Sequence, residues 1–373
     1  MSQEDPNQML RDAVGGFAAR DTSIARVRAL RETDPGFDRA VWKKIADAGW
    51  TGILVPEKFG GAGLGLPEMA AVLEEFAKTL SPEPLNAVSS LAVLTLTGGD
   101  NEGLQTRLLP QIAAGDLIAA VAWQESESGI DPAAIETTAK EAAGGYALSG
   151  SKRFVVPFGA DAYLVSAKGQ GGLIVACVDK SAKGLSVDSE LRADGTRVAR
   201  LKLDNVQVAK DDIVASAGAG ARALGQAIDQ TTILAGAELL GVMSRALEIT
   251  LDYMRTRVQF DRPIGSFQAL QHRAVDLFIQ KELSFSVLRD AHIHLAQDAE
   301  ALALWASRVK SRCSEAGMRI GRESIQIHGG IGFTDECDIG LYLKRAMVLS
   351  AWLGNGAVHR RRYAALAPAL EAA

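Results

Sequence analysis

The sequence of 373 residues is poor in cysteine, in aromatic residues and in positive charge. Its three cysteines, Cys177, Cys313 and Cys337, show no CxxC spacing, which argues against disulfides or a structural metal and fits a reducing cytosol. A net charge of -5 lacks the basic excess that is typical of nucleic-acid-binding proteins. No apolar run reaches the roughly 18 residues that a membrane span requires. We therefore expect a cytoplasmic protein with no nucleic-acid partner, no membrane association and no bound metal.

Acidic residues are also missing from one stretch near the C-terminus. No Asp or Glu occurs between Asp338 and Glu371. Within this stretch, Gly354-Asn355-Gly356 interrupts a helical pattern with a turn-prone segment. The segment is either a linker between two helices or a site that lacks an acid which its chemistry would require.

The spacing of the apolar residues changes twice along the chain. Helical stripes alternate with glycine-rich turns over residues 1–116. Over 117–217, short β-prone runs are separated by turn signals, as in a compact antiparallel sandwich or barrel. Over 218–373 the helical period returns, in segments long enough for a helical bundle. The sequence predicts an α+β fold with these three segments as its domains.

Two stretches carry motifs: YMRTRVQFDRPIGSFQALQH, from Tyr253 to His272, and IQIHGGIGFTDE, which begins at Ile325. In the first, Arg257 and Gln259 follow a helix end, and their guanidinium and amide groups suit a phosphate and an adenine. In the second, a helix stops at a pair of glycines, which lets another molecule approach the backbone closely. Each motif alone also fits an ordinary helix end, so only the two motifs together indicate a ligand-binding site.

Together and in this order, the motifs resemble those of the acyl-CoA dehydrogenase family of flavoproteins. WKKIADAGWTGILVPEKFGGAGLGLPEMAAVLEEFAKTL resembles the N-terminal domain of that family, and GSKRFVVPFGADAYLVSAK resembles a strand pair of its middle domain. The resemblance covers nearly the whole chain. It implies an N-terminal helical domain, a middle antiparallel β-domain and a C-terminal four-helix bundle.

The resemblance also implies a reaction, a CH–CH oxidation. In the family, FAD lies across a subunit interface, and a glutamate removes the α-proton of an acyl-CoA thioester while the β-hydride passes to the flavin. Such a base must be a carboxylate held away from water. We therefore expect FAD at a subunit interface, an acyl-CoA substrate and, as in the family, electron transferring flavoprotein as the electron acceptor.

The half of the family's flavin site that a subunit contributes to its neighbour is present. The matching residues, which are the expected cofactor-binding residues, are Arg257, Gln259, Phe260, Gln326, Gly329 and Gly330. One departure is Asp261, where the family usually has glycine. Its carboxylate would repel a pyrophosphate, although Arg262 could offset that charge.

The half that binds a subunit's own flavin and substrate is altered. The family's loop T-E-P-x-x-G-S-D corresponds here to the run from Gln124 to Asp131. Gln124 replaces the threonine, and Ile130 replaces the serine that touches cofactor and substrate. Val156 replaces the threonine beside flavin N5. These changes remove hydrogen bonds from the place where the flavin ring needs them.

Both family positions of the catalytic base lack a carboxylate. The common position, in a Y-E-G-T loop, is occupied by Leu353, and the less common one, on the first bundle helix, by Thr231. A hydroxyl is far too weak a base at neutral pH. Glu238 lies two helical turns beyond Thr231 on the same face and is the remaining candidate, while a solvated or paired carboxylate is the alternative interpretation.

Four hypotheses follow. The first is the base-lacking subunit of a heteromeric acyl-CoA dehydrogenase, an α2β2 heterotetramer with a homologous catalytic subunit, as in bacterial enzymes that shorten steroid side chains. The second is a self-sufficient homo-oligomer with an atypical base such as Glu238. The third is a flavin-free structural or binding protein on the same scaffold. The fourth, a flavin monooxygenase or nitroalkane-oxidising relative, is weaker because residues suited to adenosine diphosphate would have little purpose with FMN.

Overall fold

The computed structural model describes residues 7–127 and 130–371, with side chains up to residue 367. Its residues form two compact units, each assembled from separate segments. The bundle unit contains the described residues up to Arg28, residues 70–81 and the chain from Thr232 onward. The sheet unit contains residues 29–69 and 82–231. The division into 1–116, 117–217 and 218–373 stays a prediction.

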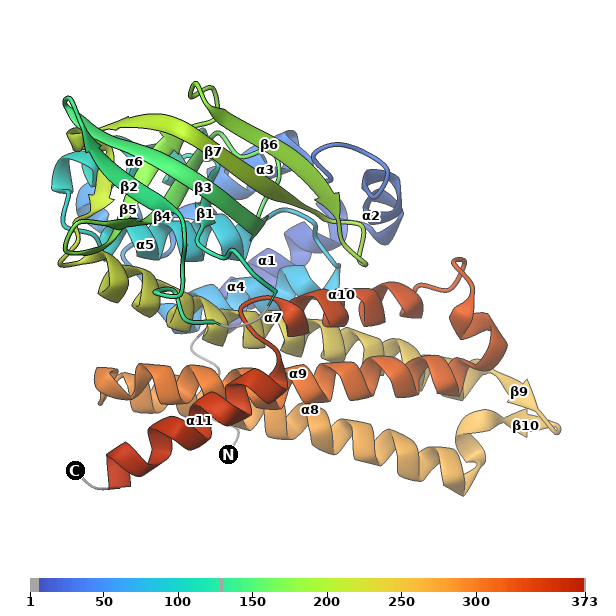
Figure 1. The fold of residues 1–373 in the computed structure, drawn as a ribbon. Coiled ribbons are helices and arrows are strands. Elements are labelled where there is room, and N and C mark those ends of the chain that lie inside the picture. Colours follow the sequence, from blue (N-terminus) through green and yellow to red (C-terminus); the bar gives the residue numbers. More distant parts are fainter. Residues whose placement is uncertain (1–6, 128–129, 372–373) are drawn as a thin grey trace. The chain divides into compact units, whose positions relative to one another are not determined.

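The helices and strands follow the order helical, β, helical (Figure 1). The helices are α1 (Gln8–Asp21), α2 (Ile24–Leu30), α3 (Arg39–Asp47), α4 (Leu66–Lys78), α5 (Val93–Thr97), α6 (Glu102–Ala113), α7 (Gly220–Thr256), α8 (Gln268–Leu295), α9 (Leu302–His328), α10 (Ile339–Ala351) and α11 (Gly356–Glu371). The strands are β1 (Ala119–Ala122), β2 (Thr138–Ala142), β3 (Gly145–Val155), β4 (Ala162–Gly169), β5 (Gly172–Asp179), β6 (Leu185–Leu191), β7 (Arg197–Ala209), β8 (Ile213–Ala215), β9 (Val258–Gln259) and β10 (Arg262–Pro263). This order confirms the predicted α+β fold.

Helix α3 illustrates how local sequence sets an element. The carboxylate of Asp38 accepts the N–H of Ala40 at 2.7 Å and caps the first turn. Of the four residues in the apolar stripe of this segment, Val41, Trp42 and Ile45 are buried, whereas the last, Ala48, is exposed. Gly49 follows with a φ of 82°, a left-handed conformation that ends the helix.

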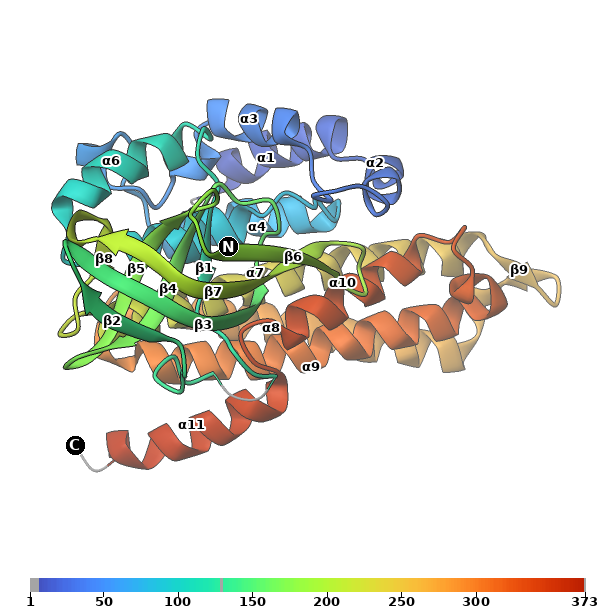
Figure 2. The same ribbon diagram turned by 45° about the horizontal axis from the view of Figure 1, so that its top comes forward.

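The sheet unit is built on one sheet with the strand order β6-β7-β3-β2-β4-β5-β8, and β1 pairs with β4 (Figures 1 and 2). Most pairs are antiparallel, as predicted, but β1–β4 and β2–β4 are parallel. The β2–β3 hairpin lies between β1 and β4 in sequence, and that long connection lets the chain return in the same direction. Strand β4 is buried on both faces from Ala162 to Ala167, as expected for a strand paired in this way.

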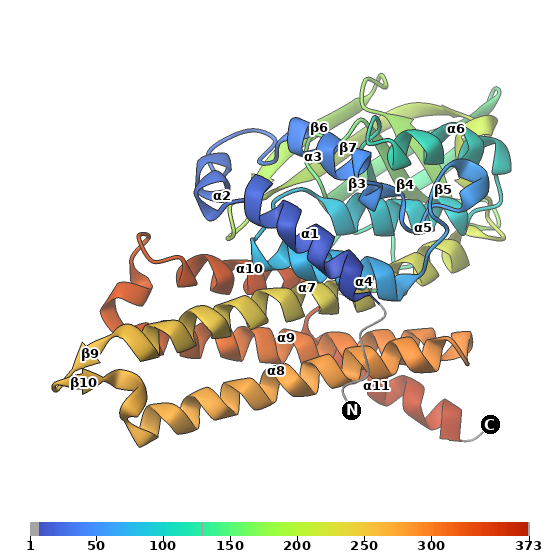
Figure 3. The ribbon, with the colours of Figure 1, turned by 180° about the vertical axis from the view of Figure 1, so that it is seen from behind.

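Helix α9 occupies the centre of the bundle unit, where it contacts α8, α10 and α11; α8 and α9 lie side by side (Figure 3). Helix α7 approaches α9 closely at Gly236, where an added Cβ would lie only 2.4 Å from Val309. Within the described residues, none of the helices combines the length and apolar character needed to span a membrane.

Candidate functional site

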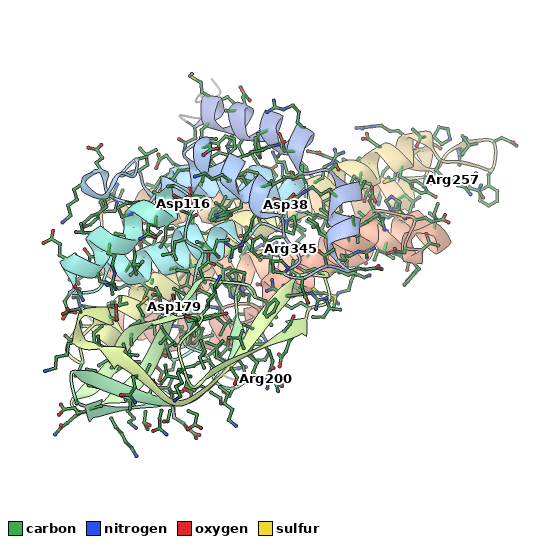
Figure 4. The ribbon with its side chains drawn as sticks, turned by 90° about the horizontal axis from the view of Figure 1, so that it is seen from above. Asp38, Asp116, Asp179, Arg200, Arg257 and Arg345 are labelled. Atoms are coloured by element: carbon green, nitrogen blue, oxygen red, sulfur yellow. The ribbon has the colours of Figure 1, made fainter. Side chains whose placement is uncertain are left out.

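The first sequence motif forms an exposed hairpin after α7. Strand β9 pairs with β10 through a two-residue turn, Phe260-Asp261, whose φ values are 54° and 61° (Figure 3). Phe260 is 86% exposed, and Arg257 and Gln259 are also exposed. Arg257 lies at the outer end of the bundle, next to this hairpin (Figure 4). The Arg257 guanidinium is therefore open to a ligand from outside the chain, and so is the exposed Gln259 side chain, although its amide nitrogen also donates to the carbonyl of Val258 at 2.8 Å.

The second motif lies at the end of α9, beside the first. The phenol of Tyr253, four residues before Arg257, donates to the carbonyl of His328 at 3.3 Å, and the two rings stack with centroids 4.3 Å apart. Gly329 follows with a φ of 66°, and an added Cβ at Gly329 or Gly330 would meet nothing within 4 Å. The structure thus brings the two motifs together and leaves the glycine backbone open to approach.

Asp261 and Arg262 do not form the arrangement that the sequence allowed. The guanidinium of Arg262 lies over the ring of Phe267, 4.2 Å from its centroid. In the part of the chain that the structure describes, Asp261 has no ion-pair partner. Arg262 therefore stacks on Phe267 at the start of α8 and does not form an ion pair with Asp261, and whether its charge offsets that of Asp261 stays a prediction.

The turn at the common base position is well formed, with Leu353 at its centre. Leu353 is 2% exposed and has a φ of 59°. The fully buried Lys310 of α9 donates through Nζ to the carbonyls of Leu349 and Gly354, both at 2.8 Å, and to two further carbonyls of this segment. Burial lowers the pKa of Lys310 to about 7, while the surrounding carbonyl oxygens favour the ammonium form.

His359 and Asn355 hold the same turn from the α11 side. His359 is buried and donates from Nε2 to the carbonyl of Leu353 at 2.8 Å, while Nδ1 accepts from Ser307 Oγ at 3.4 Å. Burial and the nearby Lys310 lower the pKa of His359 to about 4, so its ring is neutral at pH 7. The side chain of Asn355 accepts the first free N–H groups of α11. Among the described residues, the hydrogen bonds that Lys310, His359 and Asn355 make to this turn involve no carboxylate.

Glu238, the remaining base candidate, is buried in the bundle unit. One of its carboxylate oxygens lies 3.1 Å from the guanidinium of Arg345 on α10. It also lies within electrostatic range of Lys310, which binds the turn around Leu353. Glu238 is therefore near the turn but engaged in an ion pair, and removal of a substrate proton by Glu238 would have to disrupt that pair.

Thr231, at the second base position, is engaged within its own helix. Its side chain is fully buried, and its hydroxyl donates to the carbonyl of Ala227 at 2.7 Å. This i to i−4 bond uses the only proton of the hydroxyl. Thr231 therefore has no proton-accepting group to offer a substrate.

The loop after β1, in the sheet unit, is held by a buried ion pair. Lys152 is fully buried and donates to Glu125 Oε1 at 2.7 Å and to Ser166 Oγ at 3.0 Å. Burial lowers the pKa of Lys152 to about 8. Burial by itself raises the pKa of Glu125, but hydrogen bonds from Lys152 and Thr137 outweigh it, and the net pKa is lowered. The Lys152–Glu125 ion pair therefore fixes the loop after β1 to the sheet.

The altered positions of that loop offer few donors. The amide of Gln124 donates to the carbonyl of Ser126 in its own loop at 3.0 Å. Ile130 and Val156 are half-buried and have apolar side chains. Two residues of the aligned run, Ser128 and Gly129, lie outside the described residues. This half of the site does not fit the polar edge of a flavin ring, whereas the end of the bundle fits adenosine diphosphate.

A cavity of about 530 Å³ beside the Leu353 turn was missed by the motif comparison. Three arginines line it (Arg319, Arg322 and Arg360), together with Ser314, whose buried Oγ has no hydrogen-bond partner within the described residues. These side chains favour the binding of an anion in the cavity. Two features oppose anion binding. The side chain of Asn355 occupies N–H groups that the start of a helix would otherwise offer to an anion. Glu315, which pairs with Arg360 at 3.0 Å, adds negative charge. The sequence signalled only part of this cavity, in the arginine run of α11 that includes Arg360, because Arg319 and Arg322 come from α9.

Comparison with known proteins gives the same assignment over nearly the whole chain. Three family descriptions match in order: acyl-CoA dehydrogenase N-terminal domain (residues 4–116), middle domain (120–206) and C-terminal domain (218–367). Acyl-CoA dehydrogenase IpdE2 of Mycobacterium tuberculosis is 30% identical over 351 residues, which are 93% of this chain and 92% of that protein.

Two solved structures are also similar. The Tcur3481-Tcur3483 steroid ACAD has a TM-score of 0.87 and 31% identity, over 98% of both chains. The ChsE4-ChsE5 complex from Mycobacterium tuberculosis has a TM-score of 0.88 and 28% identity, over 97% of this chain and 96% of that one. With an open bundle end, a formed turn at the base position and relatives along its whole length, this chain belongs to the acyl-CoA dehydrogenase family.

Proposed function

We propose that this chain is the base-lacking subunit of a heteromeric acyl-CoA dehydrogenase. The observation that carries the proposal is the turn at the base position, which is fully formed around the buried side chain of Leu353. A residue without a titratable group cannot remove an α-proton. The carboxylate would then come from a homologous catalytic subunit, and FAD would lie at the interface between the two chains.

The exposed end of the bundle supports a contribution to a partner's cofactor. Arg257 and Gln259 face solvent, and the glycine pair after α9 is open. Bidentate arginine groups and open backbone suit a pyrophosphate. We infer that the six residues matched to the family motifs bind the adenosine diphosphate part of the FAD held by the partner subunit.

An apolar face of α8 supports association with another subunit. Its large side chains that are 43–55% exposed in the single chain are Val275, Phe278, Ile279, Leu283, Phe285 and Ile293. Exposed apolar patches of this kind mark interaction surfaces. Two similar structures carry paired names, Tcur3481-Tcur3483 and ChsE4-ChsE5, which supports a second chain here as well.

The substrate we propose is an acyl-CoA with a steroid-type side chain, on the similarity to a protein named a steroid ACAD. Electron transferring flavoprotein as acceptor and a cytoplasmic location complete the proposal. The test is co-expression with a homologue that has the glutamate and the flavin-facing threonine, followed by a count of FAD per chain. One FAD for each pair of chains is the expected result, and one FAD per chain in a purified homomer would overturn it.

Glu238 supports a second candidate, a self-sufficient homo-oligomer. Its burial in the same unit as the Leu353 turn is the observation that favours it. Under this alternative the isolated chain oxidises an acyl-CoA, and Glu238→Gln abolishes turnover while FAD content stays the same. Absence of turnover in the wild-type homomer with bound FAD removes this candidate.

A further inference from the structure

Phe260, at the tip of the hairpin, has a backbone conformation that bulky residues rarely adopt. Its φ is 54°, in the left-handed region, and its side chain is 86% exposed. An unfavourable conformation of this kind persists only where the surrounding structure over-determines it. Since Phe260 gains little from burial in its own chain, other contacts must determine its placement.

Two side chains form a layered contact with Phe260. The ring of Phe267 meets the ring of Phe260 edge-on, with centroids 6.1 Å apart and planes at 88°. On Phe267, in turn, lies the guanidinium of Arg262, 4.2 Å from the ring centroid. Edge-to-face rings and a cation over a ring are both attractive geometries. Arg262, Phe267 and Phe260 thus form a continuous series of contacts from the second hairpin strand to its tip.

The backbone fixes the position of Phe267. Its N–H donates to the carbonyl of Ile264 at 3.1 Å, and the N–H of Ile264 donates to the carbonyl of Arg257 at 2.8 Å. Phe267 also precedes the first residue of α8. The aromatic ring against which Phe260 lies is therefore tied both to the base of the hairpin and to a long helix.

We propose that Arg262 and Phe267 are positioning residues of the hairpin, which set the direction in which Phe260 and the neighbouring Gln259 meet the cofactor. The proposal rests on the proposed function, in which the end of the bundle binds a partner's FAD. Arg262 acts through an aromatic ring, so its contribution is geometric and does not consist of neutralising Asp261.

The test uses the assembled holoenzyme, from which FAD is removed and then titrated back with flavin fluorescence as the readout. Phe267→Leu removes the ring, and we expect the FAD dissociation constant to rise about tenfold. Arg262→Gln removes the cation, with an expected rise of roughly threefold. Phe267→Tyr and Arg262→Lys retain a ring and a cation, and we expect values close to wild type. Arg255→Gln is the matched control, because Arg255 is exposed at the same helix end, pairs with Asp252 and lies over no aromatic ring of the described residues.

The outcomes distinguish a positioning role in FAD binding from an effect on the folding of the chain. Arg262 is exposed, so Arg262→Gln is expected to fold, and an unchanged dissociation constant in that variant overturns the proposal. A loss of affinity in Phe267→Leu that Phe267→Tyr does not restore also overturns it. If the chain instead purifies as a homomer with one FAD per chain, the proposed function fails. The same variants then test the positioning role in that homomer, so the two failures are distinguishable.

Discussion

Lys310 and His359 donate hydrogen bonds to different carbonyl oxygens of the turn around Leu353. Lys310 Nζ lies 2.8 Å from the carbonyl oxygens of Leu349 and Gly354, and His359 Nε2 lies 2.8 Å from that of Leu353. The carbonyl of Leu349 belongs to the last turn of α10, and those of Leu353 and Gly354 follow the helix end, where the helix supplies no further N–H donors. The shape of the turn is therefore set by two buried side chains and does not depend on the chemistry of residue 353.

Replacement of Lys310 should destabilise the protein through this turn. Lys310→Met fills similar space but leaves four carbonyl groups without their donor, and we expect the free energy of unfolding to fall by about 3 kcal/mol. Urea unfolding followed by circular dichroism measures the change. Lys344→Met on α10 is the control, since Lys344 is only half-buried. Equal unfolding midpoints for the two variants would contradict the role of Lys310.

His359 should make stability depend on pH. Its folded pKa of about 4 lies below the ordinary 6.5, so the unfolded chain binds a proton first as the pH falls. The stabilisation is fully present above pH 6.5 and is lost progressively down to pH 4, by about 3 kcal/mol. His359→Gln retains a donor for Leu353 without a titrating group, and should flatten this part of the profile. A profile unchanged by the substitution would contradict the assignment.

Arg257 should govern cofactor binding by the assembled enzyme. Arg257→Ala removes a charged donor, and we expect FAD to bind about 10- to 100-fold more weakly. Arg257→Lys should be intermediate, because lysine keeps the charge but loses the planar fork. Absorbance of the purified complex gives the flavin content. Arg255→Ala, at the same helix end, should leave the content unchanged, and a similar loss there would show that charge alone is involved.

Asp261 should weaken FAD binding, since its carboxylate has no ion-pair partner within the described residues and lies only four residues after Arg257, for which we propose phosphate binding. Asp261→Asn removes the charge, and asparagine tolerates a φ of 61°. We expect FAD to bind about threefold more tightly, with a smaller gain at high salt. Glu336→Gln is a control at another exposed acid of the bundle unit. If both substitutions have the same effect, the local role of Asp261 is refuted.

Lys152 and Glu125 should stabilise the fold jointly, with a favourable coupling energy between the two side chains. Lys152→Met leaves Glu125 partly buried without its cation, and we expect a loss of about 3–5 kcal/mol. Adding Glu125→Leu should recover part of that loss, because the uncompensated charge is then gone. A double-mutant cycle by thermal or urea unfolding measures the coupling. Strict additivity of the two substitutions would mean that the pair does not anchor the loop.

The elements of the fold could be predicted because their signals are local. Most of the apolar stripe of α3 and Gly49, the glycine that ends the helix, are close together in sequence, and the structure has them as predicted. The parallel pairing of β1 with β4 could not be predicted, since it depends on which distant strand lies beside β1. Likewise, the pairing of Glu238 with Arg345 joins residues 107 positions apart. No periodicity in the sequence records such a contact.

The sequence alone determined which chemical groups this protein has at the positions its family uses: a leucine and a threonine where a carboxylate would act, and arginine, glutamine and glycine at the end of the bundle. Chemistry is a property of the side chain, and the printed residue decides it. Only the tertiary structure decided that Lys310 and His359 hold the Leu353 turn, that Glu238 is paired, and that Arg262 stacks on Phe267. These relationships depend on distances between residues far apart in the chain or on the direction of a side chain, and packing sets both.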